Sequence, residues 1–348
     1  MNVSEFDFVL TPERIAQAPP AERGTSRLLV LRRGGGLEHA SIARLPDYLC
    51  PGDLLIVNDS KVFQARLLGT RVPSGGAVEC LLLSSLDDQG RWDALVHPGQ
   101  SLRPGSRMAF GGPSHVLHGE ILEEHFHGRR TVRLWTEDGT RVEDAIDALG
   151  HVPLPPYIKR DDDLSDRERY QTVYARERGS MAAPTAGLHF TPGILDALEK
   201  RGVERAAITL HVGYGTFQPV RVDQVERHTL QRERFSISED AADAINRAKQ
   251  ESRRIIAVGT TTTRALEAAG RAGRGVITPQ SGWTDLFIYP GFDFRIVDGL
   301  LTNFHLPKSS LLMLACAFGG REAVLAAYRD AIERQYRFYS YGDAMLIV

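Results

Sequence analysis

The feature that most constrains the fold is a long all-β stretch inside a chain that otherwise mixes helices and strands. Within residues 62–150, turn clusters recur at roughly ten-residue spacing, as in small barrels and sandwiches. Five runs between them are rich in apolar and β-branched residues and predict strands: ARLLGTRV, AVECLLLSS, RWDALVH, SHVLHGEIL and RRTVRLW. The stretch closes with the proline-rich segment 151–157. We therefore expect an inserted all-β barrel domain at 62–150.

Helices and strands alternate from Thr191 onward. Thr191 is a good N-cap, Pro192 fits the first helical position, and Gly202 ends the helix. Strand-like runs follow, with helical patterns between them: AAITLHV, RIIAV, TDLFIYPG, FRIVDG and AMLIV. Such alternation predicts a layered α/β sheet, and the apolar run at 56–58 is expected to join it. The α/β catalytic domain is then discontinuous, with residues 1–61 and 151–348.

Charge and cysteine content narrow the setting of this 348-residue chain. The net charge is −2, and the insertion carries −3, so any RNA contact must be a local patch. Three arginine pairs are candidates for this RNA-contacting patch: Arg129–Arg130, Arg232 with Arg234, and Arg253–Arg254. Each pair is equally compatible with a solvated surface position that contacts no ligand. Three widely separated cysteines argue for a reducing compartment and against a cysteine-based zinc site. With no membrane-length apolar run and no basic, apolar start, we expect a cytoplasmic protein without a membrane segment.

Three histidines follow expected strands or sit in glycine- or proline-flanked loops: His189, His211 and His305. Ligands in α/β sheets bind outside the carboxyl ends of strands, so these histidines are expected to share a cleft. Each histidine, taken alone, fits a buried structural role about as well as a role in such a cleft. His189 ends GSMAAPTAGLHFT, a stretch at 179–191 whose small residues let backbone approach a ligand closely.

The segment VGTTTTRALE, at 258–267, places a glycine and threonines between an expected strand and a helix. The first amides of such a helix bind anionic groups, although simple threonine capping is the alternative. Other motifs are missing from the sequence: GxxxxGK[ST], GxSxG, HExxH and a complete dinucleotide fingerprint in GYGTF. We accordingly expect neither nucleotide triphosphate hydrolysis, a serine hydrolase triad nor a metal site.

Long motifs spread from Phe6 to Leu346 resemble the S-adenosylmethionine:tRNA ribosyltransferase-isomerases of queuosine synthesis. Among them are PGDLLIVNDSKVFQARL, GSMAAPTAGLHFTP, HVGYGTFQPV, VGTTTTRALE, TDLFIYPGFDF, TNFHLPKSSLLML and YRFYSYGDAML. The resemblance implies a monomeric cytoplasmic enzyme with S-adenosylmethionine as co-substrate, no permanently bound cofactor and no metal. Its partner is a tRNA bearing 7-aminomethyl-7-deazaguanine at the wobble position. The products are epoxyqueuosine-tRNA, adenine and methionine.

This reaction needs a base for the proton beside the sulfonium and an acid for the departing adenine. His189 and His211 are the first candidates and His305 the third, with base and acid left unassigned. Asp285, or Asp59 instead, is expected to pair with the ammonium of methionine or hold a histidine tautomer. The remaining expected substrate contacts fall into five groups: Ala183, Thr185 and Gly187 around the adenosyl group; Gly213 and Gly215 in the glycine loop, with no particular part of the substrate assigned; Thr260, Thr261 and Arg264 at the methionine carboxylate; Lys61 at a carboxylate or phosphate; and Tyr339 and Tyr341 stacked on the wobble base.

Two departures from the family pattern and two other functions qualify this expectation. Lys61 stands where the family usually has arginine, which loses a bidentate contact, and Gln231 replaces a histidine, which counts against an essential acid–base role there.

An S-adenosylmethionine-dependent RNA methyltransferase would release S-adenosylhomocysteine, and the acidic glycine-rich motif expected for it is absent. A non-catalytic RNA-binding barrel is disfavoured by the insertion's negative charge.

Overall fold

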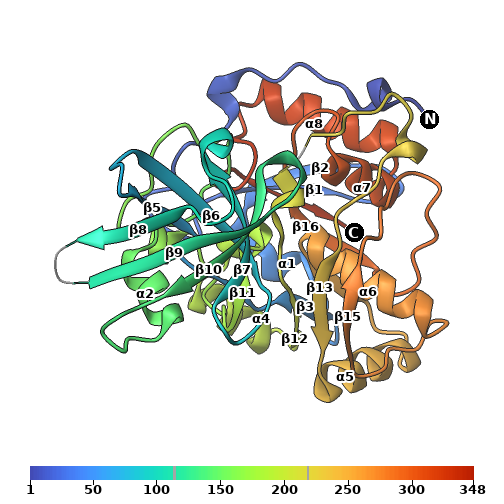
Figure 1. Ribbon diagram of the computed structural model, residues 1–348. Helices are drawn as coiled ribbons and strands as arrows, with labels where there is room; N and C mark the ends of the chain where they lie inside the picture. Colours follow the sequence, from blue (N-terminus) through green and yellow to red (C-terminus); the bar gives the residue numbers. More distant parts are fainter. Residues whose placement is uncertain (113–114, 218) are drawn as a thin grey trace.

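The computed structural model describes residues 1–112, 115–217 and 219–348, and it is built around one nine-stranded sheet (Figure 1). The four neighbours β12, β3, β14 and β16 are parallel, β17 is antiparallel to β16, and β1 is parallel to β17. The strands lie in the order β15 (Gln280–Thr284), β13 (Glu233–Ile237), β12 (Glu204–Leu210), β3 (Leu54–Asn58), β14 (Ile255–Val258), β16 (Gly299–Asn303), β17 (Ala344–Ile347), β1 (Arg27–Leu31) and β2 (Leu37–Ser41).

Helices cover both faces of this sheet. One face packs against α5 (Glu239–Gln250), α6 (Thr260–Ala272), α7 (Ser310–Gly319) and α8 (Arg321–Glu333), and the other against α1 (Leu45–Tyr48) and α4 (Pro192–Lys200). In β3, Leu54 and Ile56 enter the first core, whereas Leu55 and Val57 enter the second. A strand buried on both faces reads as a continuous apolar run, which is why LLIV has no polar alternation.

The helix boundaries follow local capping chemistry. The Thr191 and Ser238 hydroxyls accept hydrogen bonds from the Ile194 and Ala241 amides, so α4 and α5 begin where the sequence predicts. One expectation was wrong. The threonines before RALEAAG are already helical, because α6 begins at Thr260. TDLFIYPG and FRIVDG, expected to be strands or strand ends, each contribute a strand end, since β15 ends at Thr284 and β16 begins at Gly299.

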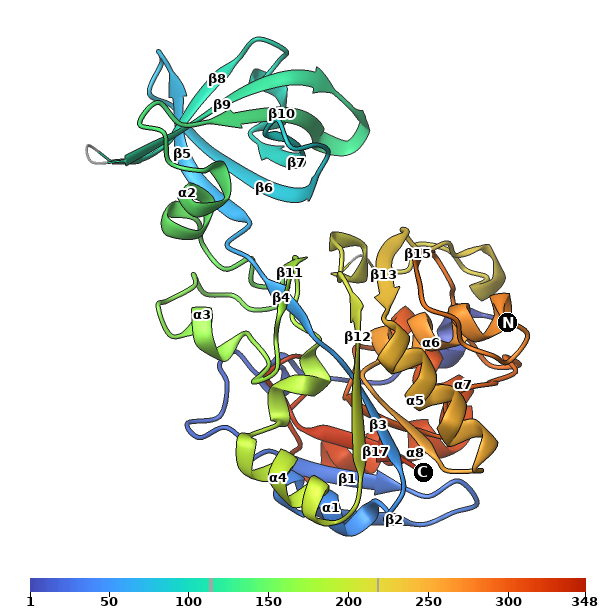
Figure 2. The ribbon, with the colours of Figure 1, turned by 90° about the horizontal axis from the view of Figure 1, so that it is seen from below.

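The inserted segment forms a closed six-stranded barrel, which stands apart from the sheet (Figure 2). Its strands are β5 (Arg66–Val72), β6 (Ala77–Ser85), β7 (Arg91–His97), β8 (Arg107–Gly112), β9 (His115–Glu124) and β10 (Arg129–Trp135). The sequence predicted five strands and missed β8, whose glycines read as a turn. The helix α2 (Val142–Leu149) closes the barrel core by burying Ile146 fully. The expected α/β class with an all-β barrel is confirmed.

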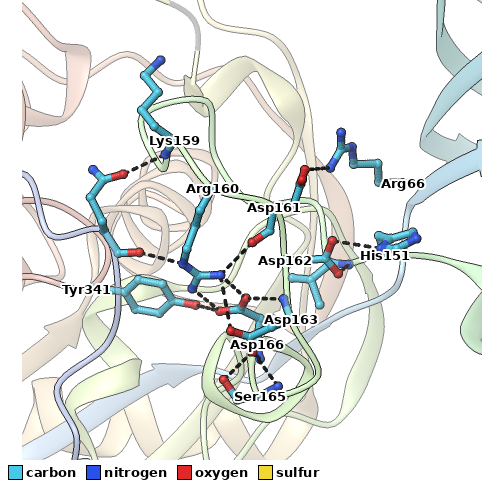
Figure 3. Close-up of polar contacts among 12 residues, drawn as sticks. Arg66, His151, Lys159, Arg160, Asp161, Asp162, Asp163, Ser165, Asp166 and Tyr341 are labelled. Atoms are coloured by element: carbon cyan, nitrogen blue, oxygen red, sulfur yellow. Dashed lines mark hydrogen bonds and ion pairs between the residues drawn. The ribbon is translucent and has the colours of Figure 1, made fainter.

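A polar cluster stabilises the connection between barrel and sheet (Figure 3). Here β4 (Ser60–Val62) pairs with β11 (Glu177–Ser180), and α3 (Asp166–Arg169) follows the proline-rich exit. The fully buried Asp166 carboxylate accepts two hydrogen bonds from Arg160, at 2.6 and 2.8 Å, and one from the Tyr341 hydroxyl at 2.9 Å. Burial acts to raise the pKa of Asp166, but the hydrogen bonds from Arg160, the Asp163 amide and Tyr341, with the charge of Arg160, together outweigh it, and the pKa lies below its usual range.

Replacing Asp166 by alanine is expected to lower the free energy of unfolding by about 3 kcal/mol, because it leaves Arg160 and Tyr341 without their shared acceptor. Since the folded pKa is lowered, this stabilisation is present above the ordinary carboxyl pKa near ~3.9 and is lost as pH falls through the folded value. Urea unfolding at pH 7 and pH 3 measures both effects. The control is Asp161→Ala, whose 94%-exposed carboxylate lies 3.7 Å from Arg66 and is expected to change stability by less than about 1 kcal/mol. Equal losses in both variants would contradict the assignment.

Across the described ranges, no single helix is long and apolar enough to cross a membrane. The helices α7 and α8 reach the required length and composition only as a pair, which is bent by 115° at Gly320.

Candidate active site

A cavity opens at the carboxyl ends of the parallel strands, with about 510 Å³ of space including its open mouth. Its walls are the segments 182–186 and 259–261, the end of β16, and the pair Tyr339–Ser340. A second cavity, of about 380 Å³, adjoins it, because Thr216 and Leu311 line both. The position outside strand ends is the one that α/β sheets use for ligands.

The turn from β14 into α6 builds one wall of the first cavity. Gly259 has φ +94°, a conformation that side chains rarely adopt, and it starts the helix without a capping side chain. The Thr262 and Thr263 hydroxyls donate back to the carbonyls of Val258 and Gly259. Thr260 and Thr261 therefore face the cavity, where the first amides of a 13-residue helix favour an anionic group.

His305 lines the first cavity and is buried. Its Nε2 lies 2.8 Å from the Thr302 hydroxyl, and the Tyr328 hydroxyl accepts a hydrogen bond from its backbone amide. Burial lowers the pKa of His305 to about 3, so the ring is neutral at physiological pH. The third histidine candidate from the sequence is thus the one that reaches the cavity.

The two leading histidine candidates lie elsewhere in the structure. His189 is buried behind the cavity, where its Nδ1 lies 3.0 Å from the Ser26 hydroxyl and its Nε2 lies 3.1 Å from the Asn303 amide. Burial lowers the pKa of His189 to about 4. His211 follows β12 beside Gly179; burial, followed by the charge of Arg234, lowers its pKa. As far as the described residues go, neither ring lines the two adjoining cavities.

Arg264 supplies the second cavity with a buried positive charge. Its Nη1 donates to Glu233 Oε2 at 2.5 Å and its Nε donates to the Leu286 carbonyl, while Nη2 has no partner among the described residues. Glu233 Oε1 accepts from the Gly213 amide and the Thr216 hydroxyl. Both charged side chains are about 95% buried. A buried guanidinium with one unused donor is suited to an anionic ligand.

The two tyrosine candidates differ in accessibility. Tyr339 lines the first cavity at φ +73°, and its ring centroid lies 3.9 Å from that of Tyr157 in an edge-to-face arrangement. Tyr341 instead donates its hydroxyl to Asp166 in the connecting cluster (Figure 3) and does not line the two adjoining cavities of the described structure. Its expected stacking on a base is not supported by this placement.

Several other expected contacts lie away from the adjoining cavities. Gly187 packs against Tyr174: a Cβ there would lie 2.3 Å from the hydroxyl oxygen, so its missing side chain serves internal packing. Asp59 accepts from Thr209 and pairs with Arg176 under a separate groove. Lys61 and Asp285 are exposed, and the Gly213 amide donates a hydrogen bond to Glu233 Oε1. Six expected residues do line the first cavity and two the second: Ala183, Thr185, Thr260, Thr261, His305 and Tyr339, then Gly215 and Arg264.

Two of the three arginine pairs have structural roles. Arg130 is buried and donates to the Gly99 and Leu102 carbonyls, and Arg254 pairs with Asp53. Arg232 and Arg234 are exposed, and the described structure gives them no ion pair. They are the chain neighbours of Glu233, which begins β13, and neither lines the second cavity in the described structure.

Sequence reasoning missed two polar residues of the site. Asn303 lines the first cavity two positions before His305, and Glu233 lies between the two exposed arginines. Their closeness in sequence to His305 and to the two arginines was the one signal that could have indicated them as site residues. Nothing in the sequence showed that both side chains are buried. The described residues contain no group of three or more side chains placed to hold a metal ion.

The class defined so far is an α/β-sheet protein with an inserted barrel and a cleft at the strand ends. The family model described as queuosine biosynthesis protein matches residues 3–347, so the chain belongs to that family. The resemblance seen in the motifs is confirmed.

Relatives of known name match the chain over its full length. An S-adenosylmethionine:tRNA ribosyltransferase-isomerase from Heliobacterium modesticaldum is 51% identical over 349 residues, and one from Desulfitobacterium hafniense is 50% identical over 350, with complete coverage of both chains in each case. The crystal structure of S-adenosylmethionine tRNA ribosyltransferase from Thermotoga maritima is similar with a TM-score of 0.56 and 36% identity, covering 99% of this chain and 100% of that one.

Proposed function

We propose that the chain transfers and isomerises the ribosyl moiety of S-adenosylmethionine onto 7-aminomethyl-7-deazaguanine at the wobble position of tRNA. The products are epoxyqueuosine-tRNA, adenine and methionine. The observation that carries this proposal is the full-length match, at about 50% identity, to relatives named for this activity. A ligand-sized cleft at the strand ends adds support from this chain's own residues.

The two adjoining cavities match the two ends of S-adenosylmethionine. The methionine carboxylate lies where the two cavities adjoin, between Arg264 Nη2, an unused charged donor of the second cavity, and the start of α6, which lines the first. The adenosyl group lies in the first cavity under Ala183 and Thr185, whose small side chains leave room for it. The carboxylate is stabilised both by the positive end of the helix dipole and by hydrogen bonding to the guanidinium.

His305 carries proton transfer in this proposal. It is buried in the wall of the first cavity, where the sulfonium-bearing carbon of S-adenosylmethionine would lie. A neutral imidazole is able to accept the acidic proton beside the sulfonium and, once protonated, to pass it toward the departing adenine. Tyr339, on the same wall, is offered as the stacking contact for the incoming base, with Arg232 and Arg234 at the tRNA backbone.

We extend the proposal to the setting of the reaction. The protein acts as a monomer in the cytoplasm, with S-adenosylmethionine as co-substrate and neither a permanent cofactor nor a metal. The reducing environment suggested by three unpaired cysteines is consistent with this setting.

A product assay tests the function. Purified protein is incubated with S-adenosylmethionine and tRNA bearing the aminomethyl base, and free adenine is measured beside nucleoside mass spectrometry. Adenine release matched by an epoxyqueuosine nucleoside is expected. S-adenosylhomocysteine would instead identify an RNA methyltransferase, and absence of turnover with tRNA binding alone would favour the non-catalytic module. The control is tRNA with unmodified guanine at the wobble position, which should yield neither product.

A further inference from the structure

Asn303 presents an unused hydrogen-bond acceptor to the first cavity. The residue ends β16, is 2% exposed and lines the cavity wall. Its Nδ2 donates to the Tyr339 carbonyl at 3.0 Å and to His189 Nε2 at 3.1 Å, which uses both amide hydrogens. Because a carbonyl only accepts, the Tyr339 contact fixes which end of the amide is which. Oδ1 is then left buried without a partner among the described residues.

The same contacts define the tautomer of His189. Since Nε2 accepts from Asn303, the proton of the neutral ring is on Nδ1, which donates to the Ser26 hydroxyl. Both ring nitrogens are therefore occupied. The ring lies against Asn303 and lines a separate small cavity with Ser26 and Tyr341, so it contacts the ligand cavity only through Asn303.

We propose that Asn303 Oδ1 accepts a hydrogen bond from a donor of the adenosyl group, and that His189 is a positioning residue that holds Asn303 in this orientation. The inference rests on the proposed function. An acceptor of this kind repels a carboxylate, whereas Arg264 in the adjoining cavity attracts one. The polarity of the two cavities thus sets the direction in which S-adenosylmethionine binds, with the adenosyl end at Asn303.

The donor is either the 6-amino group of adenine or a ribose hydroxyl, and binding measurements distinguish them. Isothermal titration calorimetry compares S-adenosylmethionine with its 6-deamino and 2′-deoxy analogues, on wild type and on Asn303→Leu. The variant is expected to bind S-adenosylmethionine roughly 10- to 100-fold more weakly, as loss of one buried hydrogen bond implies. The analogue that lacks the contacted donor should be penalised by wild type and not further by the variant. Equal affinity of both proteins for S-adenosylmethionine would overturn the proposal.

Two replacements of His189 separate positioning from acid–base catalysis. His189→Gln keeps an acceptor for Asn303 and is expected to hold the KM for S-adenosylmethionine within about threefold, with the shape of the kcat profile between pH 5 and 9 retained. His189→Leu removes the acceptor and should raise KM roughly tenfold, more than it lowers kcat. A hundredfold loss of kcat in His189→Gln, with a changed pH profile, would make His189 the base and overturn its positioning role.

Controls keep the inference separate from the proposed function. Thermal melting of each variant reports folding, and His189→Gln with Asn303→Leu still tests the idea if His189→Leu does not fold. Wild type that neither binds S-adenosylmethionine nor releases adenine would refute the proposed function. Active wild type with an unimpaired Asn303→Leu variant would refute only the inference.

Discussion

Replacing His305 by glutamine is expected to lower kcat for adenine release by about 100-fold or more, with a smaller change in KM. General acid–base catalysis by one positioned side chain contributes roughly 10²–10⁴-fold. Glutamine retains a hydrogen-bonding group beside Thr302 but cannot exchange a proton. Single-turnover release of adenine, with S-adenosylmethionine saturating, measures the chemical step directly.

The pH dependence provides a second readout for His305. Because its pKa is lowered to about 3, protonation of this ring gives no inflection in kcat/KM between pH 5 and 8. The control variant is His118→Gln, since His118 stacks on Trp135 in the barrel and is far from the strand ends. An active His305→Gln variant, with a hundredfold loss in His211→Gln, would transfer the role to His211.

Replacing Arg264 by methionine is expected to weaken binding of S-adenosylmethionine by about 100-fold and also to lower the free energy of unfolding by roughly 3–5 kcal/mol. The first effect follows from losing the charged donor in the second cavity. The second follows because Glu233 remains charged and buried without its partner, which is costlier than removing both. Calorimetric titration and urea unfolding measure the two quantities separately.

The double variant Arg264→Met with Glu233→Gln separates these effects. Removing the carboxylate charge is expected to recover most of the lost stability, because the amide oxygen still accepts from the Gly213 amide and Thr216, while the affinity stays low. Recovery of affinity together with stability would show that Arg264 supports the fold and does not contact the ligand.

Much of the fold is predictable because local chemistry agrees with tertiary structure. The capping residues Thr191 and Ser238, the apolar run of β3 and the turn-separated barrel strands all carry local signals. The strand β8 was missed because its last residues, Gly111 and Gly112, favour turns in isolation, yet the barrel pairs them with β9. TDLFIYPG contributes only a strand end, because its apolar residues pack against the core as irregular chain.

The site was harder to predict than the fold because burial decides the role of each polar group. The three histidines have similar loop contexts in the sequence, but His189 has both nitrogens occupied whereas His305 lines the cavity. Gly187 looked like a residue that makes room for a ligand, and the room is taken by Tyr174. Such distinctions depend on tertiary contacts, and those of His189 join residues more than a hundred positions apart, which composition and spacing do not encode.

The position of β17 sets the order in which the protein can assemble during synthesis. This strand lies between β16 and β1, so the hairpin of β1 and β2 has no place in the sheet until residues 344–347 have left the ribosome. The six barrel strands form their sheet with one another and end at Trp135, so all of them are synthesised before β17. Tyr339 and Ser340, which close the ligand cavity, arrive just before β17. All barrel strands of a nascent chain are therefore available for pairing before the walls of the first cavity are complete.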